Sequence, residues 1–169
     1  INQADSPKSI GSDALSQEGG TEEQYREFFA LSRVSAALSG LRDLEAILRV
    51  ALDNVLDSMG GTIGGILTLD EETQTLSYRV YRGLSAKYVE QIQVSLGEGI
   101  AGRVAQSGRA ILLEDISQDP RVAHPDLVSS EGLKAFISVP LRAKDKVLGV
   151  INIASRAPHR FTQNDMHLL

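Results

Sequence analysis

The chain has 169 residues, with 17 basic and 22 acidic side chains and a net charge of -5. This acidic balance argues against a nucleic-acid-binding surface, which needs clustered lysine and arginine to replace counterions. Cysteine is absent, which excludes disulfides, thiolate nucleophiles and cysteine-based zinc sites. The absence of cysteine fits a reducing cytoplasm, which is the location we expect. No run of about 18 apolar residues occurs, so we expect no membrane span in this segment.

The N-terminal part of the sequence predicts a linker followed by two helices. Residues 1–20 are rich in Ser, Gly, Asp and Gln, which predicts a flexible segment, and residues 21–169 are expected to form one domain. The capping-box pattern that begins at Thr21 predicts the start of a helix that ends at Gly40. Asp43 is the predicted N-cap of a second helix. Its apolar residues recur at helical spacing as far as Met59, so we expect this helix to lie on a sheet.

Alternating apolar residues predict two strands, 62–70 and 74–82, joined by a charged turn. Residues that share a face of such a strand are two positions apart. We expect one face to carry Ile63, Gly65, Leu67 and Leu69 on the first strand, and Leu76, Tyr78 and Val80 on the second.

The next segment predicts short elements. They are a helix over 85–92, a helix over 99–106 between glycines, a strand over 110–114, a loop over 115–125 and one or two helical turns over 126–132. A final helix is predicted to begin at Thr162 as N-cap, with Asp165 three residues on.

The stretch 135–155 reads as two strands around a charged turn at 143–146, and both strands are apolar on both faces. Such strands are normally covered on both sides, so we place this hairpin at the centre of the sheet. Pro140 cannot donate to a ladder and predicts a bulge. The order of elements predicts an α+β domain with a mostly antiparallel sheet of five or six strands.

Two motifs suggest chemistry that their surroundings do not support. The GxGxxG pattern at 97–102 lacks the long helix and the later acidic residue of a dinucleotide site, so we assign its glycines to tight packing. The free N–H groups of a helix beginning there could still hold an anionic group. His124, His159 and His167 show no metal-ligand spacing. Asp115 and Asp119 are expected to bind loop N–H groups, with ligand contact as the alternative.

Three segments together resemble a GAF domain: 94–126, 131–165 and 44–83. The most specific motifs are G-E-G-I-A-G-R-V, D-P-R, S-V-P-L and V-L-G-V-I-N. The resemblance implies a six-stranded antiparallel sheet with the terminal helices on one face. A ligand pocket is implied on the other face, under short helices and the loop 115–133. GAF domains sense small molecules and dimerise in histidine kinases, cyclic-nucleotide enzymes and transcription activators.

Departures from the family's patterns narrow the cofactors that the resemblance implies. The absence of cysteine excludes a covalently attached bilin and the chemistry of methionine-sulfoxide-reducing relatives. Lys134 and Ala135 stand where haem-binding relatives have a histidine, so haem is not expected. The cyclic-nucleotide signature is also absent. The ligand therefore stays unknown.

The resemblance implies a non-enzymatic regulatory domain of a bacterial signalling protein, first of all a sensor histidine kinase. A homodimer through the terminal helices and an output domain beyond Leu169 are expected. The alternatives are a ligand-free dimerisation module, or the sensor domain of a transcription activator or cyclic-nucleotide enzyme. The expected ligand-binding residues are Ile100, Val104, Leu113, Asp115, Asp119, Val122, His124, Leu133, Phe136 and Ser138.

The hairpin at 135–155 is expected to serve both sides of the sheet. The face with Ile137, Val139 and Leu141 should meet the helix that ends near Met59. The face with Phe136, Ser138 and Pro140 should line the pocket.

Overall fold

The fold is described from a computed structural model, which describes residues 40, 42–61, 63–159, 161, 162 and 165. The chain divides into two units, Ile1–Asp43 and Leu44–Leu169. The predicted linker over 1–20 and the first predicted helix, apart from Gly40, lie outside the described residues.

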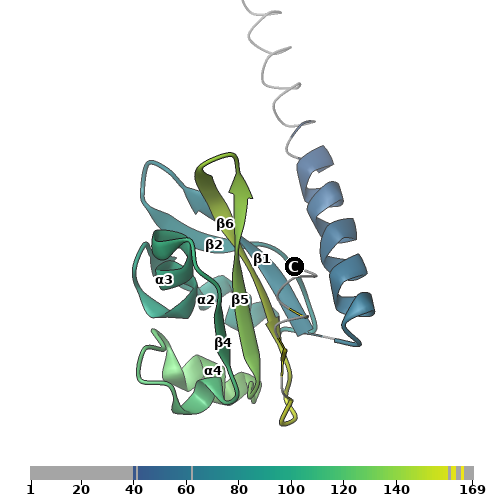
Figure 1. Cartoon of the computed structure of the whole chain (residues 1–169), viewed down its shortest axis with the longest axis vertical. Helices are drawn as coiled ribbons and strands as arrows, with labels where there is room; N and C mark the ends of the chain where they lie inside the picture. Colours follow the sequence, from purple (N-terminus) through teal and green to yellow (C-terminus); the bar gives the residue numbers. More distant parts are fainter. Residues whose placement is uncertain (1–39, 41, 62, 160, 163–164, 166–169) are drawn as a thin grey trace, which may run out of the picture. The chain divides into compact units, whose positions relative to one another are not determined.

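The second unit is an α+β domain built on one six-stranded sheet. Its elements after the first helix are β1 (Ile63–Asp70), β2 (Thr75–Arg82), α2 (Ala86–Gln91), β3 (Gln93–Ser95), α3 (Gly99–Ser107), β4 (Ile111–Leu113), η1 (Ile116–Gln118), α4 (Pro125–Glu131), β5 (Phe136–Ala143) and β6 (Lys146–Ala154). The strand order is β3-β2-β1-β6-β5-β4, and all neighbours are antiparallel. The predicted fold class and the interior position of the hairpin formed by β5 and β6 are confirmed (Figure 1).

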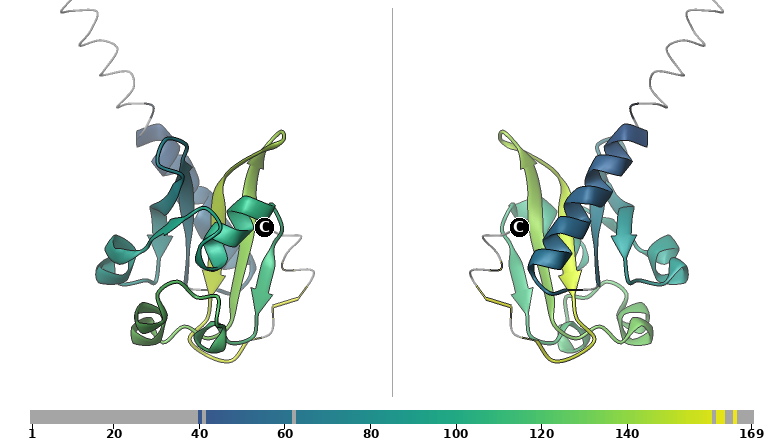
Figure 2. Two further views of the ribbon diagram at one scale, coloured as in Figure 1. Left: turned by 90° about the vertical axis from the view of Figure 1, so that its left-hand side faces the viewer. Right: turned by 90° about the vertical axis from the view of Figure 1, so that its right-hand side faces the viewer.

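One face of the sheet is covered by a helix. Residues 42–58 are helical, and the part that belongs to the second unit is called helix 44–58. Figure 2 shows it lying along this face of the sheet. It packs Leu52 and Leu56 against apolar residues of β1, β2, β5 and β6. Arg82 at the end of β2 donates to Asp53 at 2.9 Å and to Asp57 at 2.8 Å, which ties the helix to the sheet.

The opposite face is covered by the short helices α2, α3 and α4 (Figures 1 and 2). Alternate residues of β5 and β6 serve the two faces. Ile137, Ile151 and Ile153 belong to the core under helix 44–58, whereas Phe136 and Val150 belong to the core under the short helices. The predicted division of the hairpin between two layers is therefore confirmed.

Two bulges change the side on which strand residues lie. Ile66 pairs with Val80 but Leu67 pairs with Tyr78, so Arg79 has no partner on β1. This extra residue moves Val80 to the core under helix 44–58, and the prediction that Val80 shares a face with Tyr78 was wrong. A bulge reverses the period-two alternation from that point on.

The second bulge lies close to where Pro140 predicted one. Leu141 pairs with Gly149 and Arg142 with Val147, which leaves Leu148 without a partner across the hairpin. Pro140 itself pairs in register with Val150. The irregularity therefore falls on β6, just past the proline, and Leu148 is 47% exposed.

Several predicted boundaries can be compared with the structure. Gly40 and Asp43 are both helical, so neither the helix end at Gly40 nor the N-cap at Asp43 is found. The three-residue strand β3 was not predicted. Thr162 does act as a cap: its hydroxyl donates to Asp165 Oδ2 at 2.8 Å, and it accepts from the Asp165 N–H at 3.3 Å. Within the described residues, no helix is both long and apolar enough to span a membrane.

Candidate ligand pocket

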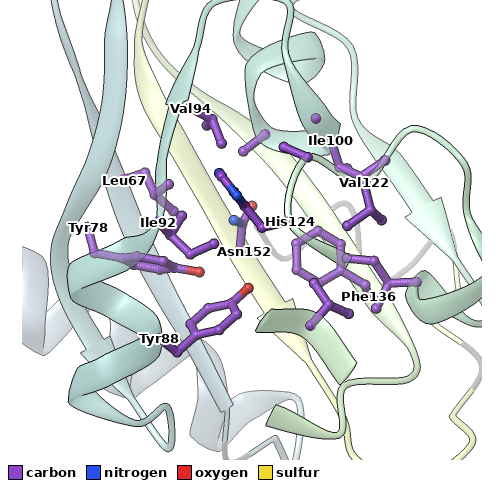
Figure 3. Close-up of a pocket in the computed structure, with 15 residues that line it drawn as sticks. Leu67, Tyr78, Tyr88, Ile92, Val94, Ile100, Val122, His124, Phe136 and Asn152 are labelled. Atoms are coloured by element: carbon purple, nitrogen blue, oxygen red, sulfur yellow. The ribbon is translucent and has the colours of Figure 1, made fainter. Parts of the chain in front are cut away.

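A pocket lies between the sheet and the short helices (Figure 3). The space open to the centre of a water molecule is about 50 Å³. One water needs about 10–15 Å³ by this measure, so the pocket has room for about three to five waters. Its polar lining residues are Tyr78, Tyr88, His124 and Asn152, and the lining holds no Lys, Arg, Asp or Glu. The remaining lining residues are apolar or glycine.

The two tyrosines enter from different elements, and each has an identifiable support. Gly65 of β1 leaves space for the ring of Tyr78, because an added Cβ would lie 2.5 Å from Cε1 of that ring. Tyr88 on α2 is held at the helix start, where its N–H donates to Ser85 Oγ at 3.1 Å. The ring centroids are 6.2 Å apart, and Figure 3 shows the two hydroxyls pointing toward each other.

Both tyrosine hydroxyls are neutral over the physiological pH range. Burial raises the pKa of Tyr88 to about 12. Burial also raises the pKa of Tyr78 well above its ordinary value, and the neighbouring Tyr88 adds to this rise. Asn152 acts in the opposite direction, because its side chain hydrogen-bonds to Tyr78 and favours the charged form. The tyrosines can therefore donate hydrogen bonds but supply no charge.

Three buried polar atoms have no hydrogen-bond partner in the described part of the chain: His124 Nε2, Ser138 Oγ and Asn152 Oδ1. Asn152 is only 5% exposed and Ser138 is fully buried. The two residues face each other across β5 and β6. Buried polar atoms normally have a partner, and an orphan among them needs an explanation. Asn152 and His124 both line the pocket, where a bound ligand would supply a partner.

A hydrogen-bonded network joins α2 and α4, two of the helices that contribute residues to the pocket lining. Glu131 at the end of α4 is 9% exposed, and its carboxylate accepts from the N–H and hydroxyl of Ser85. Arg156, just after β6, donates to Glu131 Oε2 at 2.9 Å, to the Glu131 carbonyl at 2.8 Å and to the Gly83 carbonyl at 3.0 Å. The network, here called the Glu131 clasp, joins α2, α4 and the segment that leaves β6.

The ten predicted ligand-binding residues fall into three groups. Ile100, Val122, His124 and Phe136 line the pocket. Val104, Leu113, Leu133 and Ser138 do not line it; they lie behind its wall on the same side of the sheet. Asp115 and Asp119 do not line it either.

The two aspartates have structural partners in the loop. Asp115 accepts from the Ser117 N–H at 2.9 Å and from its hydroxyl at 2.6 Å, and these bonds lower its pKa. Asp119 forms two hydrogen bonds with the Arg121 guanidinium, at 2.9 and 2.7 Å, and its pKa falls to about 2. These contacts agree with the predicted capping role. Ligand contact by either residue stays a prediction.

Sequence reasoning missed the tyrosine pair as part of the site. Tyr78 was assigned to a strand face and Tyr88 to a short helix, but nothing in their spacing indicates that their hydroxyls meet. Asn152 carried a usable signal, because it is a polar residue in an otherwise apolar strand of the hairpin. The other lining residues not predicted are Leu67, Ile92, Val94, Gly99, Ala101, Ile116, Ala123 and Val128.

The glycines of the GxGxxG segment are explained by close packing. A Cβ on Gly102 would lie 2.2 Å from the carbonyl oxygen of Ser95 on β3. Gly99 has a φ of +58° and lies against Ala123. These contacts bring the start of α3 onto the pocket.

The arrangement of sheet, short helices and pocket matches a known family. A family model described as GAF domain matches residues 42–169. The chain belongs to the GAF domain family. This result confirms the family, and the α+β fold described above agrees with it.

Relatives and solved structures of GAF domains extend this result. The chain is 27% identical over 148 residues to the Nif-specific regulatory protein of Herbaspirillum seropedicae, a match that covers 85% of this chain and 27% of that protein. The GAF domain of a phosphoenolpyruvate-protein phosphotransferase from Coxiella burnetii aligns with a TM-score of 0.66 at 21% identity, covering 74% of each chain. A domain of a protein named as a two-component sensor histidine kinase, from Sinorhizobium meliloti 1021, aligns with a TM-score of 0.61 at 21% identity, covering 73% of this chain and 81% of that one.

The chain thus spans about a quarter of the length of the curated relative. At 21% identity, the two solved structures carry the fold alone.

Proposed function

We propose that this GAF domain is a non-catalytic sensor within a larger bacterial regulatory protein. A small molecule in the pocket changes the arrangement of the terminal helices, and an output domain follows the segment. The observation that carries the proposal is Asn152, a buried residue with an unpartnered oxygen in the pocket. Its neighbours on β6, Ile151 and Ile153, pack under helix 44–58.

The regulatory proteins similar in sequence favour one kind of output over the other. The Nif-specific regulatory protein matches by sequence over most of this chain, whereas the sensor histidine kinase matches only in fold. A regulator of the Nif type is therefore the first candidate for the whole protein. The sensor histidine kinase expected from the sequence remains the second.

The Glu131 clasp offers a route from the pocket to the segment beyond β6. Ser85 caps α2 next to Tyr88 and donates to Glu131, and Arg156 binds Glu131 from the chain beyond β6. A ligand that moves α2 or α4 would change these contacts. To signal, the ligand must favour one arrangement of the clasp over another.

A homodimer through the terminal helices forms part of the proposal. Helix 44–58 has more apolar surface than the sheet covers: Leu44, Ile47 and Val50 are 44%, 65% and 60% exposed. A second copy of the helix could bury this surface. Analytical ultracentrifugation should detect a dimer that Ile47→Asp dissociates, and a monomer at all concentrations would contradict this part.

The sensing proposal is tested by hydrogen exchange. A metabolite found by thermal-shift screening should slow exchange at the pocket and also change it in helix 44–58. Arg156→Ala should retain binding and lose the change in the helix. Arg142→Ala is the matched control, because Arg142 donates to the Gly108 carbonyl on an exposed part of the pocket side, away from the clasp. Protection confined to the pocket would refute signalling through the helix.

A further inference from the structure

The polar groups of the pocket define which chemistry it accepts. They are two tyrosine hydroxyls, one imidazole and one amide, and none is a carboxylate, ammonium or guanidinium group. Burial keeps both hydroxyls protonated. A charged ligand would lose its hydration, and the lining has no Lys, Arg, Asp or Glu to offset this loss, which is expensive in a buried site.

The nearest buried charge is of the wrong sign for an anion. Glu131 raises the pKa of both Tyr78 and Tyr88 through its negative charge, so its field reaches the tyrosine end of the pocket. Arg156, which pairs with Glu131, does not line the pocket. This buried charge therefore does not favour an anion, and a cation finds Glu131 already paired with Arg156.

The hydrogen-bonding groups of the pocket match a ligand that has both a donor and an acceptor. The amide nitrogen of Asn152 serves Tyr78, which leaves Oδ1 facing the cavity without a partner (Figure 3). This oxygen needs an N–H or O–H group. The Tyr88 hydroxyl and His124 also line the cavity, and the hydroxyl can donate to a carbonyl or similar oxygen.

We propose that the pocket binds a small uncharged molecule that carries an N–H or O–H donor next to a hydrogen-bond acceptor, as a primary amide does. The donor binds Asn152 Oδ1, and the acceptor receives the hydroxyl of Tyr88. The room for about three to five waters corresponds to a ligand, or a ligand head group, of about four non-hydrogen atoms. This inference rests on the proposed sensing function and specifies the ligand class of the same pocket.

Four probes of equal size separate the possibilities: acetamide, acetate, acetamidinium and acetone. Each is titrated into the uniformly ¹⁵N-labelled 169-residue chain and followed by amide chemical shifts. Acetamide should give saturable shifts at the Asn152 side chain and at the first residues of α3. Acetone lacks the donor and should bind about tenfold more weakly, since one hydrogen bond is lost. Acetate and acetamidinium should give no saturable shift at these groups.

A matched pair of variants assigns the binding to Asn152. Asn152→Leu removes the unpartnered oxygen inside the pocket and should weaken acetamide binding about tenfold or more. Ser138→Ala removes an equally buried, equally unpartnered oxygen on the neighbouring strand, outside the lining. It should leave the affinity unchanged. Tyr88→Phe removes only the donor hydroxyl, so it tests the acceptor side if the Asn152 variant does not fold.

The results separate this proposal from the sensing function. Acetate binding as tightly as acetamide would overturn the uncharged ligand and favour an anion at the start of α3, while sensing would stand. No saturable shift from any of the four probes would also overturn it. A change of helix 44–58 on binding of a larger charged metabolite would then still support the sensing function.

Discussion

The two faces of the sheet share strands, but they differ in whether they bury polar atoms that lack hydrogen-bond partners. Under helix 44–58 the core is formed by apolar residues alone, such as Leu56, Ile137 and Ile153, each fully buried. In the described part of the chain, the three buried polar residues are Glu131, Ser138 and Asn152, and all lie on the pocket side. One face is therefore specialised for stability, whereas the other keeps polar atoms without hydrogen-bond partners.

The largest expected effect comes from breaking the helix-covered face. Leu56→Ala removes a fully buried side chain that lies over Gly61, just before β1, and over Gly64 within β1. Such a truncation should lower the free energy of unfolding by about 3 kcal/mol, because the lost contacts leave a cavity. Denaturant unfolding followed by circular dichroism measures this change.

The control for Leu56→Ala lies on the same helix. Ile47 is 65% exposed, and Ile47→Ala should change the free energy of unfolding of the monomer by no more than about 0.5 kcal/mol. Equal losses from the two variants would contradict the assignment of Leu56 to a dry, closely packed face.

The second effect is a pH dependence of stability that arises from Tyr88 on the pocket side. The pKa of Tyr88 is about 12 in the folded protein against 10.0 ordinarily, and burial is the main cause. Between these values the unfolded chain has lost the proton that the folded chain keeps, so the free energy of unfolding falls as pH rises. Full deprotonation should cost about 2–3 kcal/mol. Denaturant unfolding across this pH range measures the fall.

Tyr88→Phe separates this residue from other alkaline effects. The variant has no hydroxyl to ionise, so its free energy of unfolding should fall less steeply above pH 10 than that of the parent. Parallel curves for the two proteins would show that Tyr88 ionises as freely as an exposed tyrosine.

The third effect disturbs the support of Tyr78. Gly65→Ala places a Cβ 2.5 Å from the tyrosine ring and 3.0 Å from the Val80 carbonyl oxygen. The ring and strand must shift, which should cost about 1–3 kcal/mol and weaken ligand binding. Gly61→Ala is the control, because its nearest neighbour would be an ordinary contact at 3.4 Å. A stable Gly65→Ala protein with unchanged binding would contradict the proposed role of Gly65.

Much of the fold could be predicted from local pattern. The hairpin over 135–155 is apolar on both faces, and this placed β6 in the interior of the sheet. The faces of β2 could not be predicted, because the bulge at Arg79 depends on how β2 pairs with β1. The same applies to the end of β6, where Leu148 has no partner in the register.

Pocket residues could be predicted only where neighbours in the sequence line the pocket together. His124 and Val122 sit in a loop with turn signals, and both line the pocket. Tyr78 and Tyr88 come from a strand and a helix whose approach depends on tertiary packing, so no spacing in the chain reveals their contact. Asp115 and Asp119 have the residue types of a binding loop, but local hydrogen bonds engage both.

The smallest expected effect tests whether the unpartnered hydroxyl of Ser138, behind the pocket wall, lowers stability. Ser138 is fully buried, and its hydroxyl has no partner. Ser138→Ala removes a group whose burial is uncompensated, so the free energy of unfolding should stay within about 1 kcal/mol or rise. Denaturant unfolding of the parent and the variant measures the change in stability, and repeating it with a pocket ligand measures any change in binding. A fall in the free energy of unfolding of more than about 2 kcal/mol would mean that the hydroxyl has a bound partner such as an ordered water. The two faces of the sheet would then differ less in their unpartnered polar atoms.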